Sequence, residues 1–221
     1  MKIISKEGSV AAMSKRITRT PSRRRKLQKS VLLLVEGSTE RNIIPHCFDK
    51  RDYPDLSITI HDYNGGGYME IEHWISRRRD TLDIVLVVCD LDRAASSKDE
   101  EKALRKTIEF LWNENRKNNI FLTCPAFEEW LLRGLPASPS SPLFRCLGYG
   151  SEKEQKSDTR LWDHFVRKGG TPAIAAAWFR NKPLYYKKVD FSQGQFDENH
   201  LTTSQSALYY LEDYLQLLND K

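Results

Sequence analysis

Acidic side chains follow two apolar segments of the chain, at the point where each segment ends. Glu36 comes directly after the apolar run 31–35, and Asp90 and Asp92 follow a second run over 84–89. A continuous apolar run of this length is typical of a strand buried on both faces of a parallel sheet. Because ligands of open α/β sheets bind at the carboxyl ends of strands, the three carboxylates are expected to share one site.

Carboxylates held close together repel one another, and a bound divalent cation usually offsets this repulsion. Mg²⁺ takes one or two carboxylates, keeps several waters and completes its shell with phosphate oxygens. The sequence therefore predicts a site for Mg²⁺ or Mn²⁺, suited to metal-assisted phosphodiester chemistry, at Glu36, Asp90 and Asp92. An aspartate here can also cap a helix, but two acid-terminated apolar strands favour the metal site. Glu40, about one helical turn beyond Glu36, either joins the site or caps the helix start.

The apolar runs belong to an alternation of strands and helices. Strands are predicted at 31–35, 56–62, 84–89 and 119–124, and helices at 39–50, 68–79, 99–117 and 126–133. Such alternation is typical of a doubly wound parallel sheet with helices on both faces. The sequence thus predicts an α/β fold of about four parallel strands, with the acids at one edge.

The Pro- and Ser-rich segment 134–144 marks the end of the strand pattern. Beyond it we expect helices alone, at 158–167, 172–180 and 203–218. The chain is therefore divided into a basic arm over 1–29, an α/β core over 30–134 and a helical C-terminal appendage over 135–221.

Positive charge is concentrated at the amino end of the chain. Residues 1–30 contain ten Lys or Arg and one acid, a charge of +9, so the remainder of this +5 chain carries −4. The densest run is Arg23, Arg24, Arg25 and Lys26. We expect this run to contact the phosphate backbone of a nucleic acid, with a solvated tail as the alternative.

The sequence contains no apolar run of the roughly 20 residues that a membrane span needs. No apolar core of a secretory signal follows the basic residues, and the four cysteines form no C-x-x-C pair. Scattered cysteines of this kind are typical of a reducing compartment, so a cytoplasmic location is expected.

The order of the motifs resembles a known family. V-E-G-x-T-E after an apolar strand, followed by D-x-D after a later strand, resembles the Toprim domain of topoisomerases, primases and overcoming-lysogenisation-defect nucleases. The segment T-C-P-A-F-E-E-W-L-L at 123–132 resembles the P-x-F-E-x-W-L-L segment of RloB-like proteins. These proteins carry a Toprim domain and are associated with bacterial restriction and abortive-infection loci. Tyr186-Lys187-Lys188 is similar to the Y-K-K element of the same family.

The resemblance implies a Toprim-like sheet and a role for each matching acid. Glu36 is expected to act as general acid/base or to reach the metal, and Asp90 and Asp92 to bind it. Glu128, the glutamate of F-E-x-W, is implied as a fourth catalytic acid beside the same strand edge. The alternative for Glu128 is a charge in the first turn of a helix.

Many Toprim sites have a further acid after D-x-D, but Ala94 occupies that position here. The number of metals is therefore left open, as is compensation by Glu40 or Glu128. Lys187 and Lys188 are implied as phosphate contacts, with a solvated basic pair as the alternative.

These features together predict a Mg²⁺-dependent nuclease that cleaves DNA or RNA as an effector of bacterial anti-phage defence. An ATPase or another defence protein is the expected partner. Two other classes of protein are retained: a non-catalytic subunit that binds nucleic acid or a partner, and a phosphotransfer enzyme that processes nucleotides. No base-reading motif is present, so DNA and RNA are not distinguished.

Overall fold

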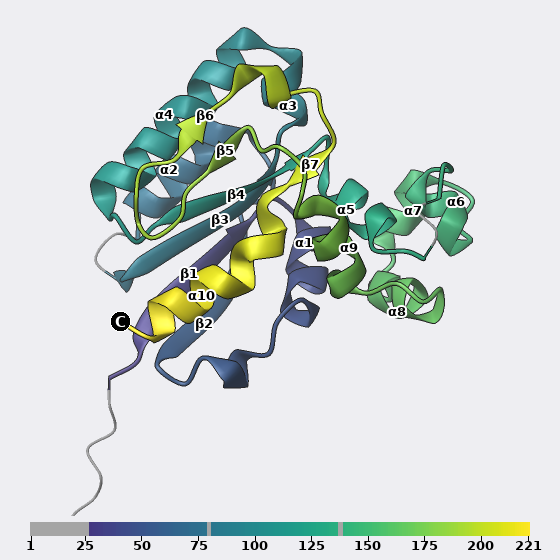
Figure 1. The fold of residues 1–221 in the computed structure, drawn as a ribbon, viewed down its shortest axis with the longest axis horizontal. Helices are drawn as coiled ribbons and strands as arrows, with labels where there is room; N and C mark the ends of the chain where they lie inside the picture. Colours follow the sequence, from purple (N-terminus) through teal and green to yellow (C-terminus); the bar gives the residue numbers. More distant parts are fainter. Residues whose placement is uncertain (1–26, 79–80, 137–138) are drawn as a thin grey trace, which may run out of the picture.

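A five-stranded sheet forms the centre of the protein, with the strand order β2-β1-β3-β4-β7 (Figure 1). Its strands are β1 (Lys29–Val35), β2 (Leu56–Asp62), β3 (Ile84–Asp90), β4 (Asn119–Cys124) and β7 (Gln205–Ser206). The first four are parallel, and β7 runs antiparallel to β4. The predicted α/β fold, with a mostly parallel sheet flanked by helices, is therefore confirmed, and β7 is an addition to it.

This computed structural model describes residues 27–78, 81–136 and 139–221. The predicted nucleic-acid contacts Arg23, Arg24, Arg25 and Lys26 lie outside the described residues. Within those ranges, no helix is both long and apolar enough to cross a bilayer.

The two acid-terminated strands lie side by side in the sheet. Residues 31–35 and 84–89 are buried on both faces, as expected of central parallel strands. In the register of this pair, Val35 lies opposite Val88. β3 continues two residues beyond Val88 to Asp90, so Glu36 and Asp90 come to the same edge of the sheet.

One face of the sheet is covered by α2 (Tyr68–Ser76) and α4 (Lys98–Glu114), which pack against each other. The short helix α3 (Asp92–Ser96) leads into α4. Leu32 and Leu34 of β1 share one buried cluster with the apolar side chains of α2 and α4. Each buried aliphatic side chain of this kind stabilises the fold by about 1.5–3 kcal/mol.

The opposite face is covered by α1 (Ser38–Ile43), α5 (Phe127–Arg133) and α10 (Leu211–Asn219) (Figure 1). The spacing i, i+3, i+4, i+7 places one apolar stripe of α10 against the sheet. That stripe is buried and consists of Leu211, Tyr214, Leu215 and Leu218. Helix α10 therefore belongs to the core of the sheet, although it is the last element of the chain.

Four further helices lie near the carboxyl ends of the parallel strands (Figure 1). They are α6 (Leu143–Leu147), α7 (Glu152–Ser157), α8 (Leu161–Arg167) and α9 (Pro172–Phe179). Phe165 and Phe179 belong to the same buried cluster as the sheet face under α10. The helices predicted at 158–167 and 172–180 correspond to α8 and α9, whereas α6 and α7 were not predicted.

The segment predicted as one helix over 203–218 contains three elements. These are β7, the 3-10 helix η5 (Ala207–Tyr210) and α10. A separate antiparallel hairpin pairs β5 (Tyr186–Lys187) with β6 (Gln195–Phe196). The expectation that no strand follows residue 144 was wrong, because strands of two residues are too short to show a periodic pattern.

The helix predicted over 39–50 was also too long. Helix α1 ends at Ile43 and is followed by the 3-10 helices η1 (Ile44–His46) and η2 (Lys50–Asp52). Pro45 lies in η1, where its lack of an N–H favours the end of the α-helix. A further 3-10 helix, η4 (Glu198–His200), precedes β7.

Lys188 is buried, which corrects its predicted contact with phosphate. Its ammonium donates to the carbonyl of Arg116 at 2.6 Å and to the carbonyl of Asn118. It also lies 4.5 Å from the centroid of the Trp112 ring. These partners precede β4, at the amino end of the parallel strands, so Lys188 anchors the entry to β4 at the end opposite the acids.

Lys188→Ala should therefore lower the free energy of unfolding by about 2–4 kcal/mol, because two carbonyls lose a charged donor and a cavity forms. Its neighbour Lys187 is exposed, and Lys187→Ala should change stability by less than about 0.5 kcal/mol. Urea unfolding of both variants measures the difference. Equal stability of the two variants would contradict the anchoring role.

Candidate acidic site

Glu36 and Asp90 lie next to each other at the carboxyl ends of β1 and β3. The backbone N–H of Asp90 donates to Glu36 Oε2 at 3.3 Å. Asp90 is the last residue of β3, and the N–H that follows, that of Leu91, donates to the Thr123 carbonyl at 2.8 Å. The sheet thus holds the backbone on which both predicted carboxylates stand.

Asp92 begins α3 and is exposed. Its Oδ1 accepts the N–H of Arg93 at 2.6 Å. Its charge contributes to raising the pKa of both Glu36 and Asp90. Asp92 is therefore a near neighbour of the first two acids, as predicted, while also bonding to the first turn of α3.

Glu40 caps the start of α1 and lies within electrostatic reach of the other acids. Its Oε2 accepts the N–H of Gly37 at 3.0 Å, which caps α1. Burial raises the pKa of Glu40 to about 7, and the charges of Glu128 and Glu36 add to this effect. The cap and the acidic site therefore share one carboxylate.

Glu128 lies in the first turn of α5 and faces a cation from the C-terminal helices. Lys156 Nζ of α7 lies 3.3 Å from Glu128 Oε1 and 2.7 Å from Glu152 Oε1. The charge of Glu128 contributes to raising the pKa of Glu40 and of Asp90. The structure thus brings the fourth predicted acid to the same edge as the other acids.

Burial and mutual repulsion disfavour the ionised forms of these acids. Burial is the largest cause that raises the pKa of Asp90 well above its usual range, followed by the charges of the neighbouring glutamates and Asp92. Burial also raises the pKa of Glu36, although the N–H of Asp90 and the charge of Arg93 oppose this shift. An added cation would favour the ionised forms.

Within the described residues, no group of three or more His, Cys, Asp or Glu side chains is arranged to hold a metal ion. The acids are thus close enough to repel one another without forming a complete metal cage. Mg²⁺ needs only one or two carboxylates beside water and phosphate. Glu36, Asp90 and Asp92 supply carboxylates of this kind, and Glu40 lies beside them.

Sequence reasoning missed Arg93, a cation beside Glu36. Arg93 is half-buried, and its charge lowers the pKa of Glu36. Arg93 Nη1 lies 3.1 Å from where a Cβ on Gly67 would be, so the side chain packs against the glycine loop that precedes α2. Within the described residues Arg93 forms no salt bridge, which leaves its charge available to a phosphate. Its position directly after D-x-D is the feature of the sequence that could have indicated Arg93 as a site residue.

Tyr68 was also missed, and it fixes the turn between β3 and α3. Its hydroxyl donates to the Asp90 carbonyl at 2.9 Å and accepts the N–H of Ala94 at 3.1 Å. Tyr68 and Lys156 reach the site from other parts of the chain, so no local motif points to either residue.

Lys187 is not part of this edge. It lies in β5, with its ammonium 5.2 Å from the centroid of the Tyr209 ring. It lines two hollows. Neither hollow is lined by any of the five acids described above, which are Glu36, Glu40, Asp90, Asp92 and Glu128.

A scan against protein-family models, a search of curated proteins and a search of solved structures each found no match for this chain. The family resemblance therefore depends on the motifs themselves.

The raised pKa of Glu40 predicts how stability depends on pH. Between about pH 4.5 and 7, the folded state retains a proton on Glu40 that the unfolded chain has lost, so stability falls as pH rises through this window. Without divalent cations, wild type should lose about 2 kcal/mol more than Glu40→Gln between pH 5 and 7.5.

Urea unfolding at the two pH values measures this difference. Glu109→Gln, which removes an exposed acid of α4, is the matched control and should behave like wild type. Parallel pH profiles of wild type and Glu40→Gln would show that Glu40 titrates normally.

Proposed function

We propose that this protein is a Mg²⁺-dependent nuclease that cleaves phosphodiester bonds in DNA or RNA. The observation that carries the proposal is the pairing of Glu36 with Asp90 at adjacent strand ends, where neighbouring acids raise the pKa of Asp90. Carboxylates in this state favour binding of a hard divalent cation. The parallel sheet and the V-E-G-x-T-E and D-x-D motifs support a Toprim-like arrangement of the core.

The residues at this edge of the sheet have different roles in the proposed phosphodiester hydrolysis. When bound, the cation would neutralise the acids and polarise the phosphate. Asp90 and Asp92 supply carboxylate oxygens to hold it. Glu36, whose pKa is raised, is suited to exchange a proton with water or the leaving oxygen. Arg93 offers a positive charge to the phosphate.

The biological role follows the motif resemblance to RloB-like proteins. It supports an effector role in bacterial anti-phage defence, with an ATPase or another defence protein as the partner.

Cleavage of a mixed panel tests the proposal. With Mg²⁺ or Mn²⁺, wild type should cut single-stranded DNA, double-stranded DNA or total RNA, and a chelator should stop it. Asp90→Asn/Asp92→Asn should lower the rate at least about 100-fold while retaining binding of nucleic acid.

The matched control is Glu109→Gln/Asp163→Asn, which removes two exposed acids from α4 and α8 and should cut like wild type. Binding without cutting of any polymer would favour the non-catalytic subunit. Turnover of free nucleotides without a polymer would favour the nucleotide-processing enzyme.

Metal binding is measurable without any activity. At about ten times its dissociation constant, Mg²⁺ should add about 1.4 kcal/mol of stability, or about 3–6 °C in the unfolding midpoint. Asp90→Asn/Asp92→Asn should remove this shift, because the two carboxylates that would hold the cation lose their charge. An unchanged shift, measured by calorimetry, would place the bound metal elsewhere.

A further inference from the structure

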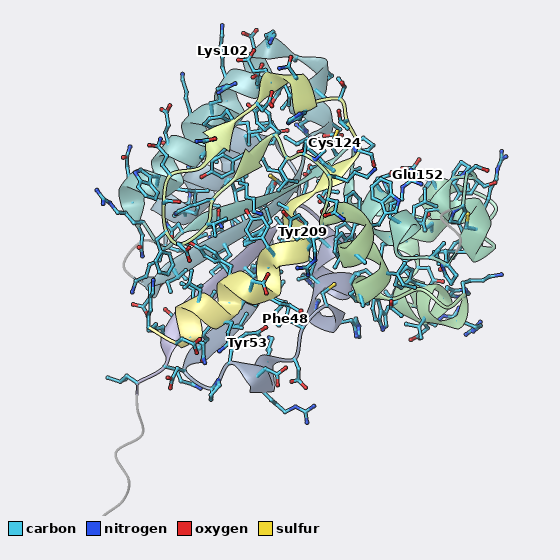
Figure 2. All side chains as sticks on the ribbon, viewed as in Figure 1. Phe48, Tyr53, Lys102, Cys124, Glu152 and Tyr209 are labelled. Atoms are coloured by element: carbon cyan, nitrogen blue, oxygen red, sulfur yellow. The ribbon has the colours of Figure 1, made fainter. Side chains whose placement is uncertain are left out.

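A hollow of about 960 Å³ lies beside the β5–β6 hairpin, apart from the five acids. We call it the basic hollow, because Arg180, Lys182 and Lys187 line it. Tyr209 also lines it and lies where the chain passes from β7 towards α10 (Figure 2).

The three cations of the basic hollow lie by aromatic rings. Lys187 Nζ is 5.2 Å and the Arg180 guanidinium carbon 6.0 Å from the centroid of the Tyr209 ring. Lys182 Nζ is 4.3 Å from the centroid of the Trp178 ring. Within the described residues none of the three forms a salt bridge, so their charges are available to an anionic ligand.

Few acids oppose these charges. Asp197 also lines the basic hollow, but its carboxylate lies 3.1 Å from Nδ1 of His200, which lines the same wall. Amide side chains of Asn181, Gln193 and Gln195 supply further polar groups. The wall therefore combines cations, a ring face and hydrogen-bonding amides.

A second hollow of about 320 Å³ adjoins the first, and the two share Arg180, Lys187, Val189 and Tyr209. The second continues along α10 to Tyr214 and Leu217, and Asp190 and Asp213 also line it. The shared wall places two cations beside one ring, and the two aspartates confine the cationic surface to the basic hollow and this wall.

Alternating cations and ring faces are the groups with which proteins hold single-stranded nucleic acid. Lys and Arg neutralise the phosphates, while unpaired bases stack on aromatic side chains. A duplex hides its base faces and cannot use the rings in this way. We infer that the basic hollow binds a single-stranded segment of DNA or RNA. This inference rests on the proposed nuclease function, and it makes single-stranded nucleic acid the substrate class of the nuclease.

The basic hollow is connected to the acid edge through neighbouring elements. β7 pairs with the carboxyl end of β4, and η5, which contains Tyr209, follows β7 directly. Helix α9 packs against both η5 and α5. The Ser204 hydroxyl lies 2.6 Å from Oε1 of Glu129, the residue after Glu128. A strand held in the hollow thus contacts elements that border the acid edge.

Fluorescence anisotropy with a labelled oligonucleotide tests the inference, using the full chain and a chelator that prevents cutting. Arg180→Ala/Lys182→Ala/Lys187→Ala should weaken binding at least about tenfold and reduce the slope of log affinity against log salt by about 2. The matched control is Arg77→Ala/Lys106→Ala/Lys153→Ala, which removes three exposed cations elsewhere. Equal losses in the two triple variants would overturn the inference.

Two variants of Tyr209 test whether its ring stacks on a base. Tyr209→Ala should weaken binding about tenfold, whereas Tyr209→Phe, which retains the ring, should bind like wild type. Urea unfolding checks that both variants are folded. A Phe variant as weak as the Ala variant would overturn the stacking contact.

Three oligonucleotides of one sequence identify the ligand: single-stranded DNA, single-stranded RNA and duplex DNA. A preference for either single strand supports the inference and names the polymer, whereas equal affinity for the duplex overturns it. If the basic hollow binds the oligonucleotide but the protein cuts nothing with Mg²⁺, the nuclease proposal is refuted and the binding inference stands. If the protein cuts but the basic-hollow triple variant binds as well as the control triple variant, the binding inference is refuted and the nuclease proposal stands.

Discussion

The burial of carboxylates at the carboxyl ends of β1 and β3, together with their mutual repulsion, is the constraint on which the surrounding structure depends. The apolar strands are central, so the acids that follow them are drawn towards the core and their ionised forms are disfavoured. Several groups offset this cost. The N–H of Asp90 reaches Glu36, and the N–H of Gly37 reaches Glu40. Cations from α3 and α7 stand beside the cluster. The negative charge that these groups leave uncompensated is the property that suits a bound metal ion.

The C-terminal part of the chain completes the sheet from both sides. Helix α10 covers one face through a single apolar stripe, and β7 lengthens the sheet beyond β4. At β7 the hydroxyls of Thr123 and Ser206 lie 2.8 Å apart in a buried hydrogen bond. The same segment then supplies Tyr209 to the basic hollow. Stability of the sheet and the shape of the proposed binding surface thus depend on the same segment of the chain.

The proposed chemistry and the proposed binding use opposite charges on different elements. Acids stand at the ends of β1 and β3, where the backbone of the sheet is rigid. Cations line a hollow formed by the β5–β6 hairpin and the chain after α9 and β7. This separation avoids neutralisation of one set of charges by the other.

The sequence by itself determined the central strands, the parallel order of the sheet and the acids at its edge. Those features are local, because a buried strand must be apolar and its end is where the first polar residue can appear. Only the tertiary structure decided the rest. Lys156 meets Glu128, and Tyr68 meets Asp90, across 28 and 22 positions of the chain. Lys188 is buried against carbonyls about 70 residues away, whereas Lys187 next to it is exposed. Such contacts depend on packing between distant segments, and a two-residue strand such as β7 is defined by its partner rather than by its own residues.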